Sequence, residues 1–309
     1  MKIFVTGSTG MVGRNLLEKM DSVNELKALS PKRSEVNLLN YEEVDNFIKL
    51  HKPDMVIHLA GRVGGIQANI SEPIKYMIEN MDMGKNIIMA SRKNGIKKLI
   101  NLGSSCMYPK NIKGKLKEEY LLTGAFEPTN EGYALAKITT LKLCEYVRQE
   151  SSEYLYKTII PCNLYGKWDK FSQDVSHMVP AVIDKLHRAK IANLEVVDIW
   201  GDGKAKREFL YAGDLADCIL KAIEKFDQLP YVTNIGQGYD YTINEYYETI
   251  AKVIGYEGGF YYDLSRPVGM QTKLLDTTKQ KKWGWNSSTS LEVGVRKTYE
   301  FYLKELVSD

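Results

Sequence analysis

The chain begins with Lys2-Ile3-Phe4-Val5-Thr6-Gly7-Ser8-Thr9-Gly10-Met11-Val12-Gly13. A β-branched and aromatic run of this kind indicates a buried strand, and the apolar residues from Met11 onward recur with helical spacing. Glycines between them allow a tight turn and a close approach of the backbone to a pyrophosphate, which the N–H groups of the following helix then bind. The run therefore predicts a dinucleotide-binding strand, turn and helix, with cofactor contacts from Gly7, Thr9, Gly10, Met11, Val12 and Gly13.

Strand-like and helix-like segments alternate through the first half of the chain. Two helix starts carry their own signals, because Asn40 with Glu43 predicts a capping box and Ser71 before Pro73 predicts a capped first turn. The alternation predicts an α/β fold with a Rossmann-type, doubly wound parallel sheet. The predicted strands are 2–6, 25–29, 55–59, 98–102 and 155–160, and the predicted helices are 11–20, 41–50, 73–94 and 132–149.

The pattern changes after about Tyr165, without a linker rich in Pro, Gly or Ser. We therefore expect residues 1–165 to form the cofactor-binding Rossmann domain, with part of 208–235 returning to it. Residues 166–309 are expected to form mainly a smaller, interwoven C-terminal lobe that binds substrate across a cleft. The predicted elements of this half are helices 177–188, 214–225, 243–254 and 290–306 and strands 195–199 and 232–235.

The composition excludes several classes of protein. A net charge of +3 with interspersed charges does not suit a nucleic-acid-binding surface, and no apolar run reaches the length of a membrane span. The four cysteines, at 106, 144, 162 and 218, have no metal-ligand spacing and are too few for a disulfide framework. We expect a cytoplasmic enzyme with free thiols, no metal site, no nucleic-acid partner and no membrane association.

Tyr133-Ala134-Leu135-Ala136-Lys137 supplies a candidate catalytic pair. A Tyr and a Lys four residues apart lie on one face of a helix, so the ammonium is expected to lower the pKa of the phenol. Ser104, in the preceding run Gly103-Ser104-Ser105-Cys106, is expected to hydrogen-bond the same substrate oxygen. These three groups predict interconversion of a ketone and an alcohol.

The end of the second predicted strand indicates the cofactor. An enzyme that prefers NAD places a carboxylate there, whereas this chain reads Leu29-Ser30-Pro31-Lys32-Arg33 and has no acidic residue until Glu35. A cation at Arg33 suits the 2′-phosphate, so we predict NADP(H).

Several blocks of the sequence together resemble the GDP-L-fucose synthase family. Members of this family are epimerase/reductases of the extended short-chain dehydrogenase/reductase superfamily. The resemblance covers nearly the whole chain, and a cysteine two residues after the serine is one of its more specific features. The matching blocks are Gly7–Gly13, Val63-Gly64-Gly65-Ile66, Leu102–Lys110, Glu127–Lys137, Asn163-Leu164-Tyr165-Gly166, Ser176–Ala181, Trp200-Gly201-Asp202-Gly203, Arg207-Glu208-Phe209-Leu210 and Lys273-Leu274-Leu275-Asp276.

The resemblance implies NADPH-dependent reduction at C4 of a GDP-linked 4-keto-6-deoxy sugar, a hexose or a heptose, with or without C3/C5 epimerisation. It implies that Cys106 is the base and His177 the acid of the epimerisation, and that Tyr133 protonates O4 beside Ser104 and Lys137. Further cofactor contacts are implied at Leu59, Ala60, Gly61, Lys137, Pro161, Asn163, Leu164 and His177. Substrate contacts are implied at Ser105, Cys106, Asn163, Lys185, Trp200, Arg207 and Lys273.

The resemblance also implies a homodimer that buries two helices of each subunit in a four-helix bundle. We assign the apolar stripes of this bundle to Met77, Met81 and Ile88 on one helix and to Leu141 and Val147 on the other. A composition rich in Lys, Ile, Asn and Tyr suggests a bacterial pathway to surface or capsular polysaccharide.

Three alternatives remain open at this stage. The chain could be a nucleotide-sugar 4-epimerase or 4,6-dehydratase that retains NAD through its cycle, or a C4 reductase without epimerase activity. A non-catalytic, dinucleotide-binding regulator is the third, although such a protein has no chemical need for Ser104, Tyr133 and Lys137 together.

Overall fold

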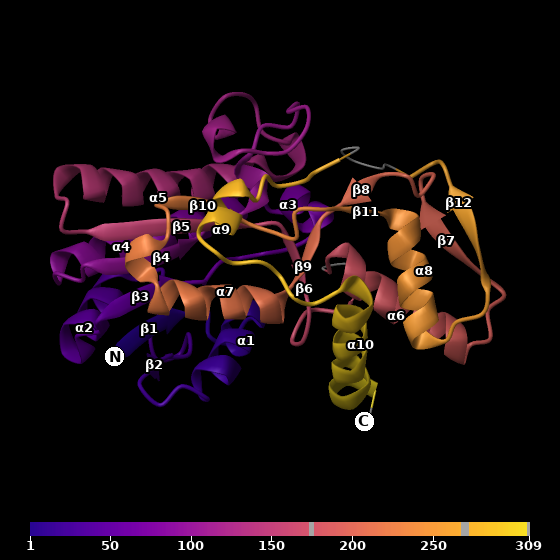
Figure 1. Cartoon of the computed structure of the whole chain (residues 1–309), viewed down its shortest axis with the longest axis horizontal. Coiled ribbons are helices and arrows are strands. Elements are labelled where there is room, and N and C mark those ends of the chain that lie inside the picture. Colours follow the sequence, from indigo (N-terminus) through magenta and orange to yellow (C-terminus); the bar gives the residue numbers. More distant parts are fainter. Residues whose placement is uncertain (173–175, 267–271, 308–309) are drawn as a thin grey trace.

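The computed structural model describes residues 1–172, 176–266 and 272–307. A larger part, which contains the N-terminus, is built around a parallel sheet. A smaller part contains short paired strands and the helices α6 (Met178–Ile191), α8 (Ile243–Ile254) and α10 (Leu291–Tyr302) (Figure 1). No helix in the described ranges is long and apolar enough to cross a membrane.

Six parallel strands form the central sheet in the order β10-β5-β4-β3-β1-β2. This order, with strands added on both sides of β1 and helical crossovers between them, is the doubly wound fold that the alternation predicts. β10 comes from the second half of the chain and pairs with β5. The exact boundary expected near residue 165 stays a prediction. The strands are β1 (Lys2–Thr6), β2 (Lys27–Leu29), β3 (Met55–His58), β4 (Lys98–Leu102), β5 (Leu155–Pro161) and β10 (Val232–Ile235).

Side chains of β1 alternate between the two faces of the sheet. Ile3 and Val5 belong to a buried cluster with apolar residues of α1 and α7, whereas Phe4 belongs to a second cluster with residues of α2 and α4. A strand buried on both faces has no polar side, which explains the unbroken apolar character of this segment. The helices of this part are α1 (Met11–Met20), α2 (Tyr41–His51), α3 (Ile66–Ser71), α4 (Pro73–Lys93), α5 (Glu131–Glu150), α7 (Ala212–Glu224) and α9 (Thr278–Lys282).

The smaller part has its own apolar cluster, formed mainly by residues of α6, α8 and α10. Three two-stranded pairs lie in or beside it, of which β6–β9 and β7–β12 are parallel and β8–β11 is antiparallel. Its elements are α6 (Met178–Ile191), α8 (Ile243–Ile254), α10 (Leu291–Tyr302), β6 (Asn163–Tyr165), β7 (Val196–Trp200), β8 (Lys206–Arg207), β9 (Phe209–Tyr211), β11 (Tyr241–Thr242) and β12 (Gly259–Asp263). Short 3₁₀ turns span Ser105–Met107, Glu118–Tyr120, Pro128–Asn130 and Phe226–Gln228, and a π-helical turn spans Leu303–Val307.

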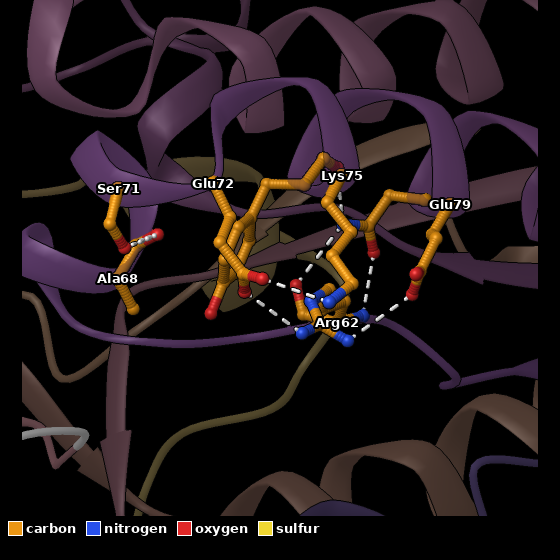
Figure 2. A network of polar contacts seen from close by, with 8 residues as sticks. Arg62, Ala68, Ser71, Glu72, Lys75 and Glu79 are labelled. Atoms are coloured by element: carbon orange, nitrogen blue, oxygen red, sulfur yellow. Dashed lines mark hydrogen bonds and ion pairs between the residues drawn. The ribbon is translucent and has the colours of Figure 1, made fainter.

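The two predicted helix caps have different outcomes. The Asn40 side chain accepts hydrogen bonds from the backbone N–H groups of Glu42 and Glu43, so this half of the predicted capping box is confirmed. The reciprocal half is wrong, because the Glu43 carboxylate accepts from the Asn37 N–H and the Asn40 side chain, whereas the Asn40 N–H donates to the Asn37 carbonyl oxygen. The Ser71 cap is wrong, because Ser71 ends α3 and its hydroxyl donates to the Ala68 carbonyl oxygen (Figure 2).

The assignment of apolar stripes on α4 and α5 also needs correction. Ile88, Leu141 and Val147 are fully buried in the clusters of their own subunit. The large apolar side chains that these two helices expose are Ile74, Ile78, Leu135 and Tyr146.

Candidate active site

The glycine loop between β1 and α1 has the geometry of a pyrophosphate cradle. Gly7 has φ +70, and a Cβ there would lie 2.7 Å from the backbone nitrogen of Ala60. A Cβ on Gly13 would lie 2.2 Å from the carbonyl oxygen of Gly7, whereas one on Gly10 would meet nothing nearer than 3.4 Å. Gly7 and Gly13 are therefore needed for the turn and for packing, and Gly10 leaves the backbone open to a ligand. The loop fits a dinucleotide.

The end of β3 lies against this loop. Thr6 Oγ1 is 2.9 Å from Nδ1 of the buried His58 and accepts a 3.2 Å hydrogen bond from the backbone N–H of Ala60. These bonds fix the segment Leu59-Ala60-Gly61, where the resemblance places cofactor contacts. Burial, with a smaller contribution from the charge of Lys137, lowers the pKa of His58 to about 3, so its imidazole is neutral.

Arg33 lies beyond the end of β2, on the exposed surface. The Ser8 hydroxyl donates a 3.4 Å hydrogen bond to the Ser30 carbonyl oxygen, which joins the glycine loop to the segment that leads to Arg33. Arg14, which sequence reasoning did not identify, donates from Nε to the Thr9 carbonyl oxygen at 3.1 Å, which places a cation beside the glycine loop.

Ser104, Tyr133 and Lys137 meet at the carboxyl end of β4. The backbone of Ser104 is extended, and its hydroxyl oxygen accepts a 3.4 Å hydrogen bond from the Cys106 N–H. Lys137 is buried, donates a 2.9 Å hydrogen bond to the Leu102 carbonyl oxygen, and has its Nζ 5.9 Å from the Tyr133 ring centroid. The three predicted catalytic groups are therefore neighbours.

Burial governs the pKa values of this group. It raises the pKa of Tyr133 well above its ordinary value, the nearby Cys106 thiol adds to that shift, and a side-chain hydrogen bond with Ser104 opposes it. The prediction that the phenol has a lowered pKa is therefore wrong for this arrangement. Burial also lowers the pKa of Lys137 to about 8. Tyr133 is thus protonated at neutral pH and can donate its proton. The neighbouring Lys137 ammonium loses its own proton at a lower pH than an ordinary lysine does.

Cys106 lies in the 3₁₀ turn that follows Ser104, and the neighbouring Ser105 is also buried. Burial raises the pKa of the Cys106 thiol, and the positive charges of Lys273 and Lys137 oppose that rise. His177 is half-buried at the N-terminus of α6, where burial and the charge of Lys273 lower the pKa of its imidazole. Lys273 therefore influences both candidate epimerase residues, which come from opposite halves of the chain.

The predicted substrate residues of the second half are distributed around β6, β7 and β8. Asn163 Nδ2 donates to the Glu208 carbonyl oxygen at 3.1 Å, and Arg207 Nη1 donates to the Lys206 carbonyl oxygen at 2.7 Å. Trp200 ends β7 and is half exposed, beneath the Arg266 guanidinium at 5.0 Å. Pro161 and Leu164, predicted cofactor contacts, lie in β5 and β6.

Lys185, an implied substrate contact, already has a charged partner within the protein. Its Nζ donates to the Asp198 carbonyl oxygen at 2.7 Å and forms an ion pair with the Asp198 carboxylate, also at 2.7 Å. Much of its charge is therefore compensated within the protein.

Sequence reasoning missed Glu208 as a supporting residue. Its buried carboxylate accepts hydrogen bonds from the backbone N–H groups of Gly238 at 2.8 Å and Leu275 at 2.9 Å. These bonds join the strand segment after Arg207 to the segment that carries Lys273. Glu208 stands in one of the sequence blocks that match the resembled family. No local pattern, however, predicts that it binds Gly238 and Leu275, which lie 30 and 67 residues further along the chain.

Comparisons with known proteins agree with this geometry. The sequence pattern of the NAD dependent epimerase/dehydratase family matches residues 3–236. A GDP-L-colitose synthase of Yersinia pseudotuberculosis is 52% identical over 309 residues, which cover 100% of both chains. A GDP-L-fucose synthase of Azorhizobium caulinodans is 47% identical, over 98% of this chain and 96% of its own.

Among solved structures, a GDP-mannoheptose C4 reductase of Campylobacter jejuni with NADP bound has a TM-score of 0.89 and 30% identity, over 97% of this chain and 98% of that one. These matches extend over both parts of the fold. The chain therefore belongs to the NAD dependent epimerase/dehydratase family and, within it, to the GDP-L-fucose synthase family.

Proposed function

We propose that this protein is an NADPH-dependent reductase that converts the C4 ketone of a GDP-linked 4-keto-6-deoxy sugar to an alcohol. The observation that carries the proposal is the group of Ser104, Tyr133 and the buried Lys137, which lies at the strand ends beside the glycine cradle. The names of the similar proteins, which are GDP-sugar synthases and a GDP-sugar C4 reductase, support the same substrate class.

Tyr133 has the properties that proton delivery to O4 requires. Its raised pKa keeps the phenol protonated, and the adjacent Ser104 hydroxyl offers a second hydrogen bond to the same oxygen. The Lys137 ammonium beside the ring stabilises the phenolate that is left after the proton moves. The glycine loop would hold NADPH, which when bound would supply hydride to the ketone carbon.

Cys106 and His177 are the proposed base and acid for inversion at C3 and C5, the two carbons that flank the ketone. Burial favours the protonated thiol and the neutral imidazole. The thiolate therefore has to form against its surroundings, with help from the charge of Lys273. Because burial disfavours the Cys106 thiolate that epimerisation requires, C4 reduction without epimerisation is the second candidate function.

We propose that Arg207 and Lys273 bind the GDP moiety. Burial lowers the pKa of both groups. An anionic diphosphate would offset the cost of these partly buried cations. Asn163 and Trp200 are proposed to contact the sugar and the nucleotide, while Lys185 contributes less because of Asp198.

The deciding experiment supplies GDP-4-keto-6-deoxymannose, or its heptose counterpart, with NADPH in deuterated water. Oxidation of NADPH with formation of a C4 alcohol is the expected result, and deuterium at C3 and C5 of the product reports epimerisation. A product that carries no deuterium at either carbon indicates a reductase only. Turnover without net NADPH consumption would instead identify an epimerase or dehydratase that retains its cofactor.

We further propose that the protein acts in the cytoplasm as a homodimer, in a pathway to surface polysaccharide. Four large apolar side chains on α4 and α5 support the dimer, since Ile74 is 78% and Tyr146 51% exposed, with Ile78 and Leu135 also exposed on these helices. A four-helix interface would bury them. Light scattering at micromolar concentration is expected to give the mass of two chains.

A further inference from the structure

Arg62 lies four residues beyond β3, and both of its backbone polar groups bind a side chain of α4. Its N–H donates to Asn80 Oδ1 at 2.8 Å, and Asn80 Nδ2 donates back to the Arg62 carbonyl oxygen at 3.1 Å. Asn80 is buried and also donates to the Tyr76 carbonyl oxygen at 2.6 Å. This reciprocal pair occupies both backbone groups of one loop residue, so the loop cannot move away from α4 without breaking it.

The Arg62 side chain is held by the same helix (Figure 2). Its two terminal nitrogens bind different carboxylates, Nη2 to Glu72 at 3.0 Å and Nη1 to Glu79 at 3.3 Å. The guanidinium also lies 5.4 Å from the Tyr76 ring centroid, and Lys75 binds the second oxygen of Glu72 at 2.8 Å. A planar fork between two carboxylates fixes orientation as well as position.

The clamp fixes the loop Gly61-Arg62-Val63-Gly64-Gly65. A Cβ on Gly64 would lie 2.2 Å from the Tyr76 hydroxyl, and the Asn69 side chain donates to the carbonyl oxygens of Gly64 and Gly65, each at 3.0 Å. Three carbonyl groups of the loop are thus satisfied. Its N–H groups at Val63, Gly64 and Gly65 donate to no other residue that the structure describes, so they are open to solvent or to a ligand.

The two ends of the loop reach the candidate active site from different sides. A Cβ on Gly61 would lie 3.1 Å from Asn80 Oδ1 and 3.6 Å from Lys137 Nζ. A Cβ on Gly65 would lie 3.5 Å from the carbonyl oxygen of Ser176, the residue before His177. The loop therefore runs from the reductase lysine to the candidate epimerase histidine.

The same turns of α4 also support the catalytic tyrosine. A Cβ on Gly132, the residue before Tyr133, would lie 3.0 Å from the Pro73 carbonyl oxygen and 3.3 Å from Met77 Cβ. One stretch of α4 thus sets the position of the loop on one side and of the N-terminus of α5 on the other.

We propose that Arg62 is a positioning residue, which fixes loop 61–65 as a wall of the sugar site and thereby holds the keto sugar in register with Tyr133. The inference rests on the proposed reductase function and adds a determinant of that site outside the catalytic group. Arg62 acts through the loop, and its own charge is used by Glu72 and Glu79.

The test compares Arg62→Ala with the double variant Glu72→Gln/Glu79→Gln. Both are expected to lower kcat for NADPH oxidation with the GDP-linked keto sugar by about 10- to 100-fold, because a misplacement near 1 Å carries a penalty of that order. The Kd for NADPH is expected to stay within about twofold of the wild-type value. Combining all three substitutions should add little, since residues that act as one unit are not additive.

Lys85→Ala is the matched control, because it removes an exposed ion pair with Asp82 on the same helix and leaves the loop untouched. It is expected to keep wild-type kcat. If Arg62→Ala raises KM with kcat unchanged, and the double glutamine variant keeps full activity, Arg62 contacts the substrate directly and the positioning role is overturned.

Hydrogen exchange in the substrate-free enzyme separates this inference from the proposed function. Amide exchange at residues 61–65 is expected to be faster in Arg62→Ala than in the wild-type protein, and unchanged exchange would overturn the clamp. If the wild-type enzyme fails to oxidise NADPH with every GDP-linked keto sugar tested, the proposed function is contradicted. The assignment of the loop as a wall of the sugar site is then contradicted as well.

Discussion

Lys137 Nζ donates a 2.9 Å hydrogen bond to the carbonyl oxygen of Leu102, the last residue of β4. The bond joins α5 to the strand end immediately before Gly103 and Ser104. It therefore sets the distance between the helix that carries Tyr133 and the turn that carries Ser104 and Cys106. In this way the lysine has a structural role in addition to its charge.

Tyr133→Phe is expected to reduce NADPH oxidation by about 10²–10⁴-fold, since a placed proton donor contributes a factor of this size. The substitution removes only the hydroxyl, so the affinity for NADPH should change by a small factor at most. Initial rates and a fluorescence titration of the cofactor measure the two quantities, with Tyr146→Phe on the exposed part of α5 as control. More than a tenth of wild-type turnover in Tyr133→Phe would remove Tyr133 from the mechanism.

The rate should fall as the pH rises through about 8. Burial lowers the pKa of Lys137 from 10.5 to about 8, so its ammonium is present below that pH and is lost above it. Because the positive charge stabilises the phenolate that forms on Tyr133, kcat/KM is expected to decline on the alkaline side. Lys137→Met should be slow at every pH and should lack this decline. A flat wild-type profile between pH 7 and 9.5 would contradict the assignment.

The regular elements of the sheet could be predicted because each carries a local pattern. β1, α1, β4, β10 and α8 have the bounds expected from sequence. The elements missed are short, such as α3 and the strands β8 and β11, and too few residues lie in them to show a period. β12 was missed for another reason, since it exists by pairing with β7 across some sixty residues of chain.

The same distinction holds for the site. Ser104, Cys106, Tyr133 and Lys137 lie in two contiguous blocks, and one helical turn brings the last two together, so the sequence indicates them directly. The clamp of Arg62 by Glu72 and Glu79 depends on how a loop lies on a helix. The pKa of Tyr133 depends on burial, which sums contributions from the whole fold. Neither is encoded in a local pattern.

Gly10→Ala and Gly13→Ala should separate cofactor binding from stability. A methyl group at Gly10 has its nearest neighbour at 3.4 Å, so the free energy of unfolding should change by less than about 0.5 kcal/mol, whereas the methyl blocks the approach of a pyrophosphate. At Gly13 a methyl would lie 2.2 Å from a backbone oxygen, which predicts a loss of about 1–3 kcal/mol. Urea denaturation and NADPH titration of both variants measure these effects. Tight NADPH binding by Gly10→Ala would contradict the cradle.

Arg33→Ala is expected to remove most of the preference for NADPH over NADH. The exposed guanidinium beyond β2 is the predicted partner of the 2′-phosphate, and a charge-assisted hydrogen bond of this kind contributes about 1.5–3 kcal/mol. The Kd for NADPH should rise by the corresponding factor and the Kd for NADH should not change. Lys49→Ala, an exposed cation on α2, serves as control. If the Arg33→Ala variant keeps the full preference for NADPH over NADH, Lys32 or Arg14 binds the 2′-phosphate instead.

Cys106→Ser should suppress exchange of solvent deuterium into C3 and C5 while reduction at C4 continues with a substrate that is already epimerised. A serine hydroxyl has nearly the shape of the thiol but is far less acidic, so it cannot serve as the base. Because burial raises the pKa of the Cys106 thiol, deuterium incorporation by the wild-type enzyme should also increase with pH, as more thiolate forms. Cys144→Ser, a buried cysteine outside the site, controls for loss of thiol packing. If the wild-type protein reduces its keto sugar without deuterium at either carbon, Cys106 and His177 are not epimerisation groups here, and the reaction ends at C4.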